Sequence, residues 1–147
     1  MNEKDIIVFI DSATNYFSKM STEIATIGIP HLMENSVAIK HEYTGIIGIT
    51  GRKKGRVYFS APELLLRQLL ISIGEHSQSK ESLMDLVGEV ANTIAGNART
   101  YFGSEFMISV PFVANVNEGI KLPPTLRCYV IPIKWKGHEA SIVISLD

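Results

Sequence analysis

Residues 79–103 constrain the fold most, because they carry one uninterrupted helical pattern between recognisable start and stop residues. Apolar side chains recur three and four residues apart, which is typical of an amphipathic helix with one buried face. Ser79 or Ser82 provides an N-cap at the start, and Gly103 suits the C′ position at the end. We therefore expect one long helix that continues to Phe102.

Two further helices are predicted. The first runs from about Asp5 to Ile24, where apolar residues again recur at helical spacing. The second is Pro62–Ile73, with Ser60 as its N-cap, Pro62 in the first turn and Glu63 three residues after the cap. Gly74 ends this second helix.

Several β-rich segments separate the helices. A turn at residues 51–55 joins two of them, and Lys136-Gly137 joins the last two as a hairpin. The sequence thus predicts a single domain over residues 1–147, an α/β fold of the α+β type, in which an antiparallel or mixed sheet packs against three helices, two of them long. The predicted strand segments are 36–43, 44–50, 56–60, 105–112, 127–135 and 139–146.

Composition excludes several classes of protein. Charged residues make up 20% and hydrophobic residues 46% of the 147, and the net charge is −1, so neither nucleic acid nor a membrane is an expected partner. No apolar run approaches the ~20 residues that cross a bilayer, and the N-terminus lacks signal-peptide features. With Cys128 as the single cysteine, no internal disulfide forms, and we expect a cytoplasmic protein.

One face of the long helix is unusual. At about 100° per residue, a set of polar and small side chains falls opposite the apolar stripe. The outer face of a helix is often polar without any function. Here, however, the face contains two glycines, each of which costs a helix ~1 kcal/mol relative to alanine. Glycines would let a second protein approach the helix backbone. We therefore expect a docking surface rather than a pocket. The set comprises Asp85, Gly88, Glu89, Asn92, Gly96 and Arg99.

The segment DLVGEVANTIAG resembles the signature helix of the CheC/CheX/FliY family of chemotaxis phosphatases. That signature is an acid or serine, three residues, Glu, two residues and Asn, here Asp85, Glu89 and Asn92. The segments IIGITGRKKGRVYFS and ISVPFV, which carries Pro111, also look like family elements. The chain has no second E-x-x-N, so it is similar to the CheX members rather than to CheC or FliY.

The resemblance implies a phosphatase that acts on the phospho-aspartate of a CheY-like response regulator. Asn92 would position the attacking water, and Glu89 would pair with a lysine of the regulator. Asp85, Gly88 and Gly96 would contact the partner, although Asp85 can equally be solvated surface. The chain would bind no cofactor or metal itself, since the Mg²⁺ belongs to the regulator, and it would form a homodimer. The alternative is a non-catalytic module that binds a response regulator or a flagellar-switch component.

Other candidates are weaker. Four basic residues in the turn 52–56 suit a solvated hairpin tip or a contact to an acidic regulator. Contact with nucleic acid is disfavoured, because no aromatic residues are interleaved and the net charge is negative. The four histidines are dispersed and lie near no cysteine or acid pair at ligand spacing, so no metal site is expected. Cys128 falls in a predicted strand and is expected to be buried and inert.

Overall fold

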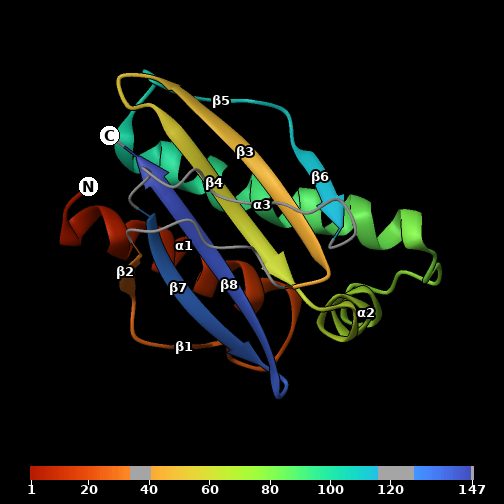
Figure 1. The fold of residues 1–147 in the computed structure, drawn as a ribbon. Helices are drawn as coiled ribbons and strands as arrows, with labels where there is room; N and C mark the ends of the chain where they lie inside the picture. Colours follow the sequence, from red (N-terminus) through yellow and green to blue (C-terminus); the bar gives the residue numbers. More distant parts are fainter. Residues whose placement is uncertain (34–40, 116–127, 147) are drawn as a thin grey trace.

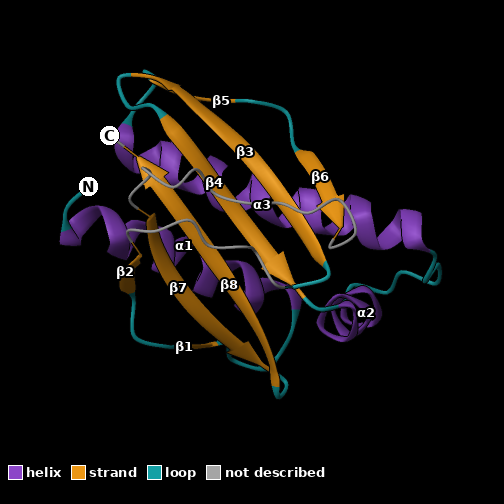
Figure 2. Ribbon diagram, in the orientation of Figure 1, coloured by secondary structure: helices purple, strands orange, loops and turns teal. Residues whose placement is uncertain are grey.

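The computed structural model describes residues 1–33, 41–115 and 128–146. Its described strands form one sheet whose strand pairs are all antiparallel, with three helices (Figure 1; Figure 2). The predicted α+β class is therefore confirmed. The elements are α1 (Glu3–Met20), β1 (Thr26–Ile27), β2 (His31–Met33), β3 (Tyr43–Gly51), β4 (Gly55–Ala61), α2 (Glu63–Ser72), α3 (Lys80–Phe102), β5 (Phe106–Ile108), β6 (Phe112–Asn115), β7 (Cys128–Trp135) and β8 (His138–Leu146).

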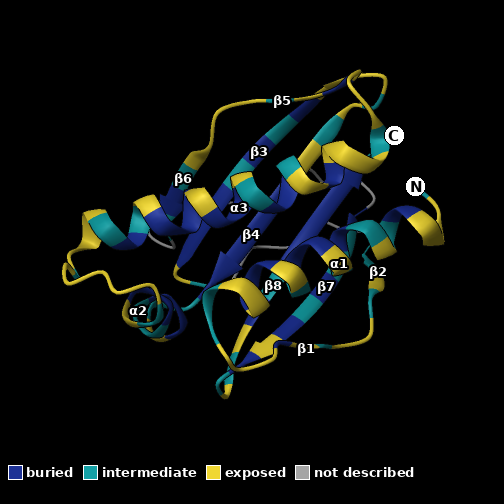
Figure 3. Ribbon diagram, turned by 180° about the vertical axis from the view of Figure 1, so that it is seen from behind, coloured by how far each residue is buried: buried dark blue, intermediate teal, exposed yellow. Residues whose placement is uncertain are grey.

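The sheet has the order β1-β7-β8-β4-β3-β5, with β2 also paired to β7 and β6 to β3. Helices α1 and α3 lie side by side across one face, and α2 stands at one end of the sheet (Figure 1; Figure 3). The main core fills the space between these two helices and the sheet (Figure 3). None of the described helices is apolar and long enough to cross a bilayer.

Helix α3 begins and ends where the sequence predicts. The Ser79 hydroxyl accepts a hydrogen bond from the Ser82 amide at 3.1 Å, which identifies Ser79 as the N-cap. At the other end, Gly103 adopts φ 96° and its amide donates to the Arg99 carbonyl. The β7–β8 hairpin is also confirmed, because Lys136 and Gly137 both take positive φ between paired Trp135 and His138.

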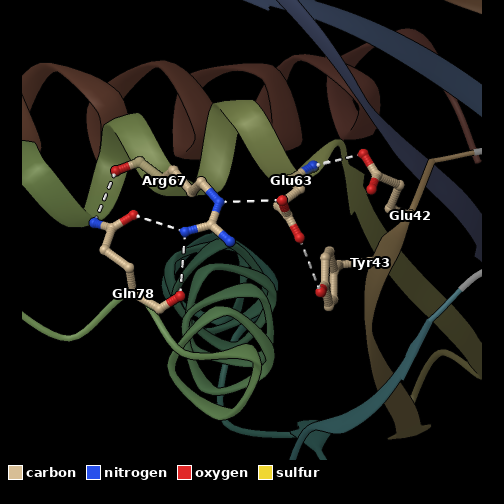
Figure 4. A network of polar contacts seen from close by, with 5 residues as sticks. All are labelled: Glu42, Tyr43, Glu63, Arg67 and Gln78. Atoms are coloured by element: carbon tan, nitrogen blue, oxygen red, sulfur yellow. Dashed lines mark hydrogen bonds and ion pairs between the residues drawn. The ribbon is translucent and has the colours of Figure 1, made fainter.

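The predicted N-cap of α2 is wrong. Ser60 lies inside β4, fully buried, and its hydroxyl hydrogen-bonds with that of Thr44 at 2.9 Å. The helix starts at Glu63, whose amide donates instead to the carboxylate of Glu42 (Figure 4). The free amide at the start of α2 is thus satisfied by Glu42, 21 residues earlier in the chain, and not by the nearby Ser60.

The bounds of α1 also differ from the prediction. The helix starts earlier because Asn2 and Asp5 form a reciprocal capping box. It ends at Met20, since Ser21 is extended and its hydroxyl accepts from the Glu23 amide, a local bond that competes with helix continuation.

The predicted strand 105–112 is divided into β5 and β6, which both pair with β3. On β3, two residues separate Ile46 from Ile49. Three residues separate their partners Phe112 and Ile108, so the edge carries one extra residue, a β-bulge. Most of the predicted strand 36–43 lies outside the described residues, and β3 starts at Tyr43.

Helix α3 approaches the sheet most closely at Gly45 of β3. A Cβ atom at this position would lie 2.4 Å from the Val87 carbonyl oxygen and 3.0 Å from the Ala91 Cβ. Only a residue without a side chain leaves room for the helix backbone here.

We expect Gly45→Ala to lower the free energy of unfolding by about 1–3 kcal/mol or more, because the added methyl group collides with the helix backbone. The matched control is Gly48→Ala in the same strand. Its Cβ would meet only the Ser109 side chain at 3.4 Å, so we expect a change within about 0.5 kcal/mol. Urea unfolding followed by circular dichroism measures both, and equal stability of the two variants would contradict the close approach.

Candidate functional site

The candidate site is the outer face of the middle of α3. Glu89 and Asn92 are both exposed there, three residues apart and therefore neighbours on the helix surface. Asp85 is exposed one turn before Glu89. The predicted outward placement of these three side chains is confirmed (Figure 3 shows the exposed face of α3).

The opposite face of α3 is buried, as the apolar pattern predicts. Tyr101 is the exception, since it is 55% exposed and packs edge-on against Phe102. The next residue, Phe102, packs against the core instead and stacks on the Phe106 ring. The fully or almost fully buried residues are Leu83, Leu86, Val87, Val90, Ala91, Ile94, Ala95 and Ala98.

The two glycines of the motif lie in different environments, and the expected exposure of Gly88 is wrong. Gly88 is buried, and a Cβ there would lie 2.8 Å from Val113 Cγ2 and 3.3 Å from Pro111 Cβ. The edge segment around β6 covers this side of α3, which a helical wheel does not reveal. Gly96 is half-buried, and nothing lies within 4 Å of its hypothetical Cβ.

Glu89 influences the neighbouring helix electrostatically. Tyr16 of α1 is 5% exposed, and burial, followed by the negative charge of Glu89, raises the pKa of its phenol. Tyr16 therefore stays a neutral group beside the site at physiological pH. Sequence reasoning missed this residue, because its proximity to α3 depends on how the two helices pack.

Among the described residues there is no cluster of metal-binding side chains and no exposed thiol. Across the described parts of the chain, no three His, Cys, Asp or Glu side chains come together in a way that could hold a metal ion. Cys128 is buried at the start of β7, and burial raises the pKa of its thiol, which favours the unreactive protonated form. The chemistry available to the exposed face is hydrogen bonding by an amide and ion pairing by carboxylates.

The basic turn between β3 and β4 is partly engaged within the molecule. Lys53 lies 3.7 Å from the Asp5 carboxylate and sits over the Phe102 ring at 5.5 Å. Arg52 approaches Glu105 at 3.9 Å with both side chains largely exposed. The turn therefore links the start of α1 to the end of α3, rather than being only a solvated tip.

Comparison with known proteins assigns the chain to a family. Residues 43–134, more than half of the chain, match the family model for the chemotaxis phosphatase CheX, and this range includes the whole of α3. The chain belongs to the CheX family. No curated protein sequence matches it significantly.

Solved structures of similar fold extend over the whole chain. A CheC-like superfamily protein from Shewanella sp. PV-4 is 27% identical, with a TM-score of 0.84 and coverage of 100% of this chain and 99% of that one. A chemotactic CheC-like protein from Shewanella oneidensis MR-1 is 26% identical, with a TM-score of 0.80 and complete coverage of both chains. CheX in a CheX–CheY–BeF₃–Mg²⁺ complex from Borrelia burgdorferi is 20% identical, with a TM-score of 0.76 and 96% coverage of each chain, which is a likeness of fold.

We expect the two glycines to respond oppositely to alanine. Gly96→Ala should raise the free energy of unfolding by about 0.5–1 kcal/mol, because alanine favours the helix and its methyl group meets nothing. Gly88→Ala should lower the free energy of unfolding. Overpacking against Val113 and Pro111 costs about 1–3 kcal/mol, which outweighs the gain in helix propensity. Thermal and urea unfolding of the two variants would refute this assignment if Gly88→Ala were the more stable.

Proposed function

We propose that this protein accelerates hydrolysis of the aspartyl phosphate on a CheY-like response regulator. The observation that carries the proposal is the exposed amide of Asn92 beside the exposed carboxylate of Glu89, on the face of α3 that the core does not use. Membership of the CheX family supports it. So does the fold shared with a CheX that was crystallised with CheY, BeF₃ and Mg²⁺.

The chemistry needs no nucleophile from this chain. A water oxygen bonds to phosphorus while the bond from phosphorus to the aspartate oxygen breaks, giving a free carboxylate and dihydrogen phosphate. Catalysis then depends on holding the water in line. The carboxamide of Asn92 can accept a hydrogen bond from the water through its oxygen and donate to a phosphoryl oxygen through its NH₂ group. A hundredfold acceleration corresponds to only about 2.7 kcal/mol.

Glu89 has a different proposed role. Its carboxylate would form an ion pair with a lysine at the regulator's active site and so bring Asn92 into the acidic pocket. The Mg²⁺ would be held there by acidic residues of the regulator. Gly96, open and one turn beyond Asn92, would allow the partner to come close to the helix backbone, whereas buried Gly88 no longer belongs to the proposed contact surface.

The assembly state is a separate expectation. The resemblance to CheX implies a homodimer, and this stays a prediction that analytical ultracentrifugation can test. A cytoplasmic location likewise follows from the proposed role, because response regulators act in the cytoplasm.

We expect Asn92→Ala to abolish stimulated dephosphorylation while retaining most of the regulator binding. The side chain is exposed, so its removal leaves no cavity and should change stability by less than about 0.5 kcal/mol. Phosphate release from an acyl-phosphate-charged regulator of the same organism measures the activity. Unchanged release would eliminate the proposed mechanism. Wild-type protein that binds the regulator without stimulating release would favour the non-catalytic binding module.

We expect Glu89→Ala to act mainly through association. Loss of the ion pair should weaken binding about tenfold or more, since the regulator's lysine is left without its partner. The dependence of dephosphorylation rate on protein concentration gives the apparent affinity. A normal concentration dependence in this variant would contradict the anchoring role, and Glu89→Gln tests whether charge or shape is responsible.

A further inference from the structure

A small groove separates the C-terminal end of α2 from the N-terminal half of α3, and it is continuous with the proposed docking face because Glu89 lines it. Leu70 and Leu86, each 3% exposed, contribute its apolar part, together with the more exposed Ile73. The groove has a volume of about 130 Å³, against roughly 300–1,000 Å³ for pockets that take small molecules. It therefore suits one inserted side chain better than a metabolite.

One wall of the groove is a fixed structure. Gly74 has φ 78°, and the next amide, that of Glu75, donates to the Leu70 carbonyl at 2.9 Å. The Glu75 carboxylate accepts from the Ser77 amide at 3.1 Å, and the Ser82 hydroxyl of α3 donates to the Ser77 hydroxyl at 2.8 Å. Hydrogen bonds thus tie Glu75 to α2 directly and to α3 through Ser77.

The groove is negatively charged, and no described cation forms an ion pair with its carboxylates. Glu75, Asp85 and Glu89 line it, and no lysine or arginine of the described residues does. The ion pairs found among the described residues include none of these three carboxylates. Asp85 and Glu89 are also four residues apart on one helix, where like charges destabilise by about 0.2–0.5 kcal/mol.

The one cation of α2 does not neutralise the groove. Arg67 is committed to Glu63 at 3.1 Å, and to the carbonyl and side-chain oxygens of Gln78 at 3.2 and 3.3 Å (Figure 4). The described carboxylates are not grouped closely enough to hold a metal ion. The groove therefore combines apolar walls with negative charge, and this combination is complementary to a cationic side chain with an apolar stem.

We propose that this groove receives a lysine or arginine side chain of the phosphorylated response regulator, distinct from the active-site lysine assigned to Glu89. The stem would lie along Leu86 and Ile73, and the cationic head would meet Asp85 and Glu75. This inference rests on the proposed phosphatase function. It adds a second anchor beside the α3 motif, by which the surface selects regulators that carry a basic residue at the matching position.

The test compares two double variants of equal charge. Glu75→Gln with Asp85→Asn removes two negative charges from the groove, and Glu3→Gln with Glu23→Gln removes two exposed ones from α1 and the turn after it. Binding to the organism's own CheY-type regulator, loaded with Mg²⁺ and beryllofluoride, is measured by calorimetry at several salt concentrations. Circular dichroism verifies that both variants are folded.

We expect the groove variant to bind about tenfold more weakly and with a shallower salt dependence, and the control to bind within about twofold of wild type. Alanine substitutions of basic residues around the regulator's phosphorylation site should include one that weakens binding to wild type but not to the groove variant. Equal affinities of the two double variants, or a groove variant altered only in self-association, would overturn the groove inference. The proposed phosphatase function would still stand. Wild-type protein that neither binds nor dephosphorylates the regulator would overturn the proposed function and this inference with it.

Discussion

The close approach of α3 to β3 determines where the candidate site stands. At Gly45 the strand has no side chain between it and the helix backbone, so the Val87 carbonyl oxygen lies only 2.4 Å from where a Cβ would be. Glu89 and Asn92 follow within two turns on the opposite side of the same helix. Because backbone contacts with a sheet deform little, the candidate side chains are carried by a rigid element rather than by a loop.

Features with local causes were predictable from the sequence, and features set by distant residues were not. Ser79 and Gly103 cap α3 through bonds that span three or four residues, so the chain itself carries the signal. Ser60 has the same local signature, but Thr44 of the adjacent strand engages its hydroxyl, and Glu42 caps α2 instead. Tertiary contacts therefore decide between equivalent local candidates.

The same distinction applies to the site. The outward placement of Asp85, Glu89 and Asn92 follows from helical periodicity alone. The burial of Gly88 does not, because it depends on the packing of Val113 and Pro111, from the sheet edge, against the side of α3. The proximity of Tyr16 to Glu89 likewise requires the packing of α1 beside α3.

The two glycines of the motif thus carry different physical meanings, although both weaken a helix by a similar amount. The cost at Gly88 is offset within the subunit, since the missing side chain is what allows the sheet edge to pack against α3. The cost at Gly96 is not offset in this way, because nothing lies within 4 Å of the Cβ that this residue lacks. A helix under selection for stability alone would carry alanine there, as natural proteins accept local instability chiefly at functional surfaces. The open glycine, one turn beyond the exposed amide, is therefore the stronger sign that another protein's backbone comes close to α3.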